Sequence, residues 1–180
     1  MTRIPLLFPL AFAAALSAQT LHTVDKLDLE RYQGRWYEVA RKPNRFQKAC
    51  NSDVLVQYGL RPDGNLDVYN QCSESDGDLR SVTGLGRLPD PAGAPAKLEV
   101  RFAPAFLSFL PMVWADYWVI DLDPDYRWAA VGGPDRKYLW VLSRTPTLPQ
   151  ATLDGILERA KAQGYDLSDL VLTRHTQPDR

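Results

Sequence analysis

Two cysteines, Cys50 and Cys72, and two histidines, His22 and His175, carry the most reactive side chains of this 180-residue chain. A thiol beside an imidazole could act as a nucleophile–base pair, and several such ligands together could bind zinc. Both histidines lie near the ends of the chain, far in sequence from the cysteines, so neither arrangement is well supported. The cysteines could instead form a disulfide, bind a metal as a pair or remain reactive thiols.

No other set of residues has the pattern of a catalytic centre. The sequence contains no G-x-S-x-G motif, no cluster of metal ligands and no glycine-rich phosphate loop. The formal net charge is -1, which gives no electrostatic reason to expect nucleic acid as a partner. We therefore expect a protein without catalytic residues, cofactor, metal or nucleic-acid partner.

The first 18 residues have the pattern of a secretory signal peptide. Arg3 precedes an apolar run from Ile4 to Leu16, and small residues follow, so that cleavage after Ser17 or Ala18 is expected. A membrane anchor is the weaker alternative because the run is short for a bilayer span. The cleavage region holds no cysteine, so we expect residues 19–180 to form an exported single domain without a lipid anchor. Export favours a Cys50–Cys72 disulfide.

Eight short segments of alternating polarity fill most of the remaining chain. Turn residues separate them, as in Arg61-Pro62-Asp63-Gly64-Asn65, where proline presets φ and glycine accepts a positive φ. Short strands at even spacing predict an all-β antiparallel barrel or sandwich. The predicted strands lie near residues 36–41, 54–60, 66–70, 81–88, 97–102, 117–121, 128–131 and 138–142.

A single helix is predicted after the last strand. It begins within residues 147–150, carries apolar residues at helical spacing and ends at Gly164. Leu139 and Val141 are apolar where a solvated strand would be polar, so the outer face of that strand is the expected docking place for the helix.

Barrel topology predicts which residues meet at one end. In an up-and-down barrel, the start of the first strand lies beside the ends of the even-numbered strands, which brings Trp36 close to Arg144. A guanidinium over the indole would form a cation–π contact, and Gly34 leaves room for the chain to turn beneath. This end should be closed. Glu38 and Asp121 are expected to face inward near it and to make structural hydrogen bonds.

Three segments resemble the signature regions of the lipocalin family. They are GRWYEVAR at 34–41, DYWVIDLDPDY at 116–126 and GGPDRKYLWVLSRTP at 132–146. The resemblance is to bacterial lipocalins and to the related apolipoprotein D and plant temperature-induced branch, and it extends from about Leu27 to about Leu172. It implies an eight-stranded antiparallel up-and-down β-barrel with an external C-terminal helix.

In that family the residues matched by Gly34, Trp36 and Arg144 are structural. The barrel holds a small hydrophobic ligand such as a fatty acid or lysophospholipid. Bacterial relatives are often outer-membrane lipoproteins, so this chain is expected in the periplasm or at the outer membrane, without the lipid anchor.

Ten residues are predicted to face the barrel interior by alternation. They could simply pack against one another, but we favour a ligand cavity because the family uses it so. Three tyrosines among them would add polar tips to an apolar wall, which suits a lipid with a polar head. The set is Val56, Tyr58, Leu66, Val68, Val100, Phe102, Tyr117, Val119, Tyr138 and Trp140.

The open end should carry an apolar connection, residues 104–114, between the fifth and sixth strands. It could contact a membrane surface, cover the cavity as a lid or join two copies of the chain as a homodimer. Cys50 and Cys72 are expected at the same end, which supports their pairing. The basic residues of 41–48 also lie there, and an ordinary solvated loop is slightly favoured over attraction of anionic head groups.

Three functions therefore remain to be compared. The first is a carrier of a small lipid in the cell envelope. The second is an isomerase-type enzyme acting on a sequestered lipid, for which free thiols of low pKa would be required. The third is an interaction protein that binds a partner through residues 104–114, with the barrel interior filled.

Overall fold

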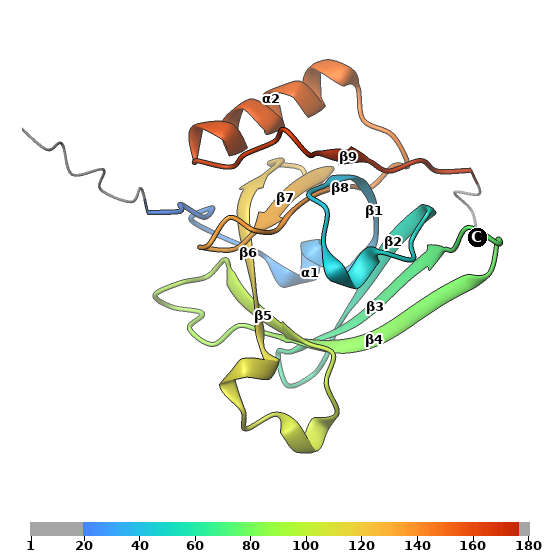
Figure 1. The fold of residues 1–180 in the computed structure, drawn as a ribbon. Coiled ribbons are helices and arrows are strands. Elements are labelled where there is room, and N and C mark those ends of the chain that lie inside the picture. Colours follow the sequence, from blue (N-terminus) through green and yellow to red (C-terminus); the bar gives the residue numbers. More distant parts are fainter. Residues whose placement is uncertain (1–19, 177–180) are drawn as a thin grey trace, which may run out of the picture.

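A computed structural model describes residues 20–176 of the chain. The predicted signal peptide, residues 1–18, lies outside the described residues. Within these residues nine strands form one antiparallel sheet in the order β2-β3-β4-β5-β6-β7-β8-β1-β9, and a further β1–β2 pairing closes it into a barrel (Figure 1). The predicted eight-stranded barrel is confirmed, with one short strand added. The strands are β1 Gly34–Arg41, β2 Ser52–Leu60, β3 Leu66–Ser73, β4 Leu79–Arg87, β5 Lys97–Arg101, β6 Ala115–Leu122, β7 Trp128–Gly132, β8 Leu139–Ser143 and β9 Val171–Leu172.

The closure of the barrel divides β1 into two halves. Its first half, Gly34–Tyr37, pairs with β2, whereas Ala40 and Arg41 pair with β9. The backbone N–H of Asp53 in β2 donates to the carbonyl of Arg174, 2.9 Å away. The C-terminal segment therefore fills the gap that opens between β1 and β2 as they approach the open end.

The long helix α2, Gln150–Ala162, packs on the outside of the barrel as predicted. Leu153 and Ile156 are buried in one apolar cluster with Leu139 and Val141 of β8. The helix is followed by Gly164 at φ 89°, a left-handed conformation that glycine adopts without strain. In Figure 1 the helix lies outside the barrel, on the side of β7 and β8.

Short helices cover the two ends of the barrel. The helix α1, Leu29–Tyr32, lies at the closed end. The Asp28 side chain caps this helix by accepting two backbone N–H groups. At the open end lie three 3₁₀ turns, η1 Arg45–Gln47, η2 Ala105–Leu107 and η3 Pro111–Val113. None of the helices within residues 20–176 is long and apolar enough to cross a membrane.

The barrel wall is incomplete on one side. The strand β4 pairs with β3 over residues 79–86 but with β5 only through Leu85–Arg87. Residues 102–114 stand away from the wall beside this gap (Figure 1). As a result, residues 79–83 of β4 are exposed.

Candidate functional site

The closed end is built by Trp36 and Arg144. The Arg144 guanidinium lies 3.7 Å from the centroid of the Trp36 ring, so the predicted cation–π contact is present. The same guanidinium donates to the carbonyls of Arg31 and Arg35, at 2.7 and 2.9 Å. Gly34 has a φ of 93°, and a side chain there would approach the Arg144 guanidinium to 3.4 Å. Together these residues seal the base of the barrel.

Above this base lies a cavity of about 780 Å³ that opens at the other end. Apolar residues of several strands line its walls, and polar side chains gather toward its mouth. Seven of the ten residues predicted to face the interior line the cavity. They are Val56, Tyr58, Val68, Val100, Phe102, Tyr117 and Trp140.

The other three predicted lining residues lie elsewhere. Leu66 and Val119 belong to the buried cluster that fills the barrel interior around Trp36, outside the cavity lining. Both residues face the barrel interior, as alternation predicts, but alternation does not give the height along the barrel, and they lie below the cavity. Tyr138 precedes β8 and stacks on Trp140, with ring centroids 5.6 Å apart, and is absent from the lining.

The prediction that two acidic residues face inward near the closed end is only partly right. Asp121 faces outward, where its carboxylate accepts from Arg159 of α2 at 2.6 Å. Glu38 does make structural hydrogen bonds, but it lies at the cavity and reaches a residue of the open end, Gln47. The outward position of Asp121 follows from a strand irregularity, because the register of β6 and β7 shifts between Val119 and Asp121.

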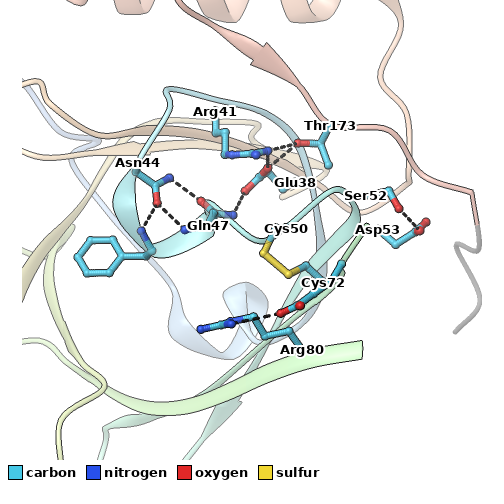
Figure 2. The surroundings of a disulfide bond; sticks show 12 residues. Glu38, Arg41, Asn44, Gln47, Cys50, Ser52, Asp53, Cys72, Arg80 and Thr173 are labelled. Atoms are coloured by element: carbon cyan, nitrogen blue, oxygen red, sulfur yellow. Dashed lines mark hydrogen bonds and ion pairs between the residues drawn. A yellow bond between two sulfur atoms is a disulfide. The ribbon is translucent and has the colours of Figure 1, made fainter. Parts of the chain in front are cut away.

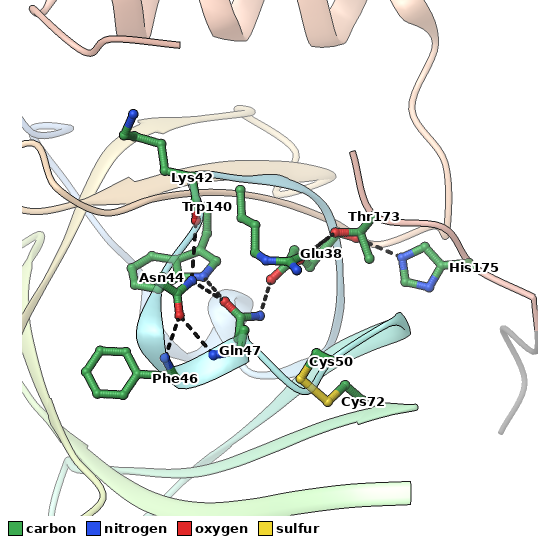
Figure 3. Close-up of polar contacts among 11 residues, drawn as sticks. Glu38, Lys42, Asn44, Phe46, Gln47, Cys50, Cys72, Trp140, Thr173 and His175 are labelled. Carbon is green, nitrogen blue, oxygen red and sulfur yellow. Dashed lines mark hydrogen bonds and ion pairs between the residues drawn. A yellow bond between two sulfur atoms is a disulfide. The ribbon is translucent and has the colours of Figure 1, made fainter. Parts of the chain in front are cut away.

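A polar network latches the first loop to the barrel wall (Figure 3). The Gln47 amide donates to Glu38 at 2.5 Å and accepts from the Trp140 indole N–H at 2.8 Å. Asn44 donates to the same Gln47 oxygen at 2.6 Å. On its other oxygen Glu38 accepts from Arg41 at 2.8 Å. Sequence reasoning missed this latch because its partners are brought together only by the loop conformation.

Cys50 and Cys72 form the expected disulfide beside this latch (Figure 2). Their Cα atoms lie 5.5 Å apart. Both cysteines line the cavity, so the bond fixes the end of the first loop to β3 at the mouth. Among the described residues neither a free cysteine nor a cluster of three or more metal-binding side chains is present.

The basic residues of the first loop do not act as one group. Arg41 is paired with Glu38, and Lys42 is bound to Asp169 at 2.5 Å. Arg45 lines the cavity mouth, as does Arg80 of β4. The two arginines at the mouth come from different elements, which sequence proximity alone did not reveal.

Three tyrosine hydroxyls form a chain at the inner end of the cavity. Tyr117 lies between the other two, with its oxygen 2.8 Å from that of Tyr32 and 2.6 Å from that of Tyr58. Burial raises the pKa of all three hydroxyls well above the ordinary tyrosine value. The chain is therefore neutral at physiological pH.

The connection between β5 and β6 presents apolar side chains to solvent. Phe106, Phe109 and Met112 are 75%, 76% and 84% exposed. Met112 also lines the cavity mouth. Trp114 lies at the end of the connection. The centroid of its ring is 3.8 Å from the guanidinium carbon of Arg87. The exposed part of residues 104–114 thus borders the entrance of the cavity.

A closed antiparallel barrel with an apolar cavity open at one end and a helix outside defines a small-ligand-binding barrel. Residues 27–175 match the family model described as a lipocalin-like domain. The chain belongs to the lipocalin family, which is known for binding small hydrophobic ligands. The predicted family and fold are confirmed.

Individual relatives cover most of the chain. Temperature-induced lipocalin-1 of Arabidopsis thaliana is 43% identical over 151 residues, covering 83% of this chain and 80% of that protein. The outer membrane lipoprotein Blc of Escherichia coli K12 is 38% identical, covering 82% and 79%. The structure of insecticyanin from the tobacco hornworm Manduca sexta aligns with a TM-score of 0.68 at 19% identity, covering 87% and 85%, which supports the fold alone.

Proposed function

We propose that the protein carries or stores a small lipid, such as a fatty acid or lysophospholipid, in the barrel cavity. The observation that carries this proposal is the open cavity of about 780 Å³, whose walls include Val56, Val68 and Val100. An apolar cavity with a few polar groups at its ends suits a molecule with an acyl chain and a polar head. Arg45 and Arg80 at the mouth would attract an anionic head group.

Binding without catalysis is the function we favour. An isomerase-type enzyme with a cavity thiol is the alternative, and it would need one of the two cysteines to be free. Both thiols are joined in the disulfide. This arrangement supports a carrier and leaves the second hypothesis without its nucleophile.

The proposed location is the periplasm or the outer membrane, after export. Residues 1–18 have the signal-peptide pattern, and an oxidising compartment suits the Cys50–Cys72 disulfide. The relatives named outer membrane lipoprotein Blc also support a place in the envelope.

The experiment for the cavity is a titration of the delipidated protein with palmitate and lysophosphatidylcholine, followed by tryptophan fluorescence. Trp140 lines the cavity and should report binding. Val68→Phe would place a larger side chain in the cavity and should weaken binding at least tenfold. Thr83→Phe, at an exposed position of β4, should leave binding unchanged. No saturable binding of either lipid would overturn the carrier proposal.

A membrane contact through residues 104–114 is the second proposal for this site. The exposure of Phe106, Phe109 and Met112 beside the entrance favours it, because a lipid could then pass directly between bilayer and cavity. Phe106→Ser/Phe109→Ser should lose co-sedimentation with phosphatidylethanolamine–phosphatidylglycerol vesicles, and Tyr69→Ser on the outer wall should not. A homodimer through the same residues would instead show as a change of sedimentation coefficient in the absence of vesicles.

A further inference from the structure

The tyrosine chain holds one hydroxyl hydrogen more than it can use. Three hydroxyls supply three donors, but only two hydrogen bonds join them. Among the described residues, the hydroxyls of Tyr32, Tyr58 and Tyr117 form hydrogen bonds only with one another. One O–H group is therefore left to find an acceptor outside the chain.

The position of Tyr32 decides where that donor lies. Tyr32 has no exposed surface and does not line the cavity, so an unused hydroxyl hydrogen there would carry the full cost of desolvation. Tyr32 therefore donates to Tyr117. The spare hydrogen then belongs to Tyr117 or to Tyr58, and both residues line the cavity.

An unused acceptor lies on the same wall. Asn70 of β3 lines the cavity, and its side-chain oxygen is buried without a hydrogen-bond partner. In the β2–β3 register Val68 is opposite Tyr58, and Asn70 is opposite Val56. Asn70 thus lies two residues above the level of Tyr58 on the same face, a rise of about 7 Å.

The described residues that surround this polar spot are mainly apolar, and none of them is a free cation. Val56, Val68 and Val100 form the wall, and Glu38 is already paired with Arg41. The cationic side chains that line the cavity, Arg45 and Arg80, belong to the mouth. A buried carboxylate would lose its hydration here without gaining a counter-ion, whereas a neutral group would only exchange hydrogen bonds.

We propose that the tyrosine hydroxyls and Asn70 form an inner subsite for an uncharged hydrogen-bonding group, such as a hydroxyl, at the buried end of the ligand. This inference rests on the proposed lipid-carrier function and deepens it. The ligand class it selects is an amphiphile with polar groups at both ends: an anionic or zwitterionic head near the mouth and a hydroxyl on the far end of the acyl chain.

The test compares fatty acids with their ω-hydroxy derivatives at 10, 12 and 16 carbons, using calorimetric titration of the delipidated protein. At the chain length that spans from mouth to subsite, the ω-hydroxy acid should bind about fivefold more tightly than its parent, the effect of one net hydrogen bond. A purely apolar inner wall would give the opposite order, because the hydroxyl would be desolvated without a partner.

Two matched variants assign the preference to the hydroxyl chain. Tyr32→Phe/Tyr58→Phe/Tyr117→Phe removes every member, leaves no orphaned hydroxyl and should reverse the preference. Tyr32→Phe alone keeps the Tyr58–Tyr117 pair with its spare donor and should retain the preference. Asn70→Leu, which removes the acceptor, should reduce it.

The outcomes separate this inference from the carrier proposal. If no parent fatty acid binds the wild-type protein, the carrier proposal itself fails. If parent acids bind but are preferred over their ω-hydroxy derivatives at all three lengths, the inner subsite is wrong and the carrier proposal stands. The same ratio of affinities in the triple variant as in Tyr32→Phe would also overturn the subsite.

Discussion

At the scale of single residues, Arg144 joins several parts of the closed end. It covers the Trp36 ring and donates to carbonyls that precede β1 and lie within it. Arg144→Ala should lower the free energy of unfolding by about 2–3 kcal/mol, because the cation–π contact is lost and carbonyls lose their donor. Urea denaturation measures this loss.

Arg35→Ala is the matched control for Arg144. Its side chain is exposed, and only its backbone carbonyl takes part in the closure. Arg144→Lys should recover part of the stability, since a lysine keeps the charge but not the planar fork. Equal stability of Arg144→Ala and Arg35→Ala would show that the closed end does not depend on Arg144.

The buried tyrosines predict a dependence of stability on pH. The folded protein holds the pKa of Tyr58 and Tyr117 well above the ordinary value of 10, because burial disfavours the phenolate. The unfolded chain therefore releases these protons first, and the stability they contribute is complete below pH 10 and falls as the pH rises above it.

The measurement is the difference in unfolding free energy between the wild type and the triple phenylalanine variant. That difference should decrease as the pH rises from 9 to 11, since the lysines common to both proteins cancel. A difference that stays constant over this range would mean that the three hydroxyls are hydrated and titrate normally.

At the scale of elements, the 3₁₀ turn η1 acts as a latched cover at the mouth. Gln47 holds it to β1 through Glu38 and to β8 through Trp140. Gln47→Ala should free the loop and speed amide hydrogen exchange of residues 42–50 about tenfold, as expected for the loss of one or two hydrogen bonds. Lys48→Ala, at an exposed neighbouring position, should leave exchange unchanged. Equal exchange in both variants would show that the disulfide alone fixes the loop.

An element can be predicted from the sequence when it has a local periodic pattern of apolar residues. Strands with one buried face show a period of two in their apolar residues, and α2 shows apolar residues at helical spacing. The barrel and its helix could therefore be predicted. The ninth strand was missed because two residues, Val171–Leu172, are too few to show a period. The height of Leu66 and Val119 in the barrel depends on strand register, which alternation does not contain.

The polar groups of the cavity were harder to predict than its walls. Asn70 alternates in phase with Val68, so the pattern of β3 contained the signal, but an amide among apolar residues was not counted as lining. The Gln47 latch and the convergence of Arg45 with Arg80 depend on loop conformation and on closure of the barrel. Long-range contacts of this kind have no local signature in the sequence.

At the scale of the whole molecule, the two ends of the barrel have different tasks. The closed end is sealed by Trp36 and Arg144, whereas the open end combines a latched loop, a disulfide and the exposed residues 104–114. A sealed base with an open mouth suits the proposed carrier, which would take up its ligand and release it at the same end.

The measurement that tests the carrier account most directly is quenching of tryptophan fluorescence by a dibrominated stearate. Bromine quenches only nearby indoles, and Trp140 is the cavity-lining tryptophan among the described residues. The account predicts saturable quenching at one lipid per chain, most of it lost in Trp140→Phe and kept in Trp128→Phe, whose ring packs in the helix-side cluster. Quenching that is absent, or that Trp140→Phe leaves unchanged, would place the lipid outside the barrel and contradict the account.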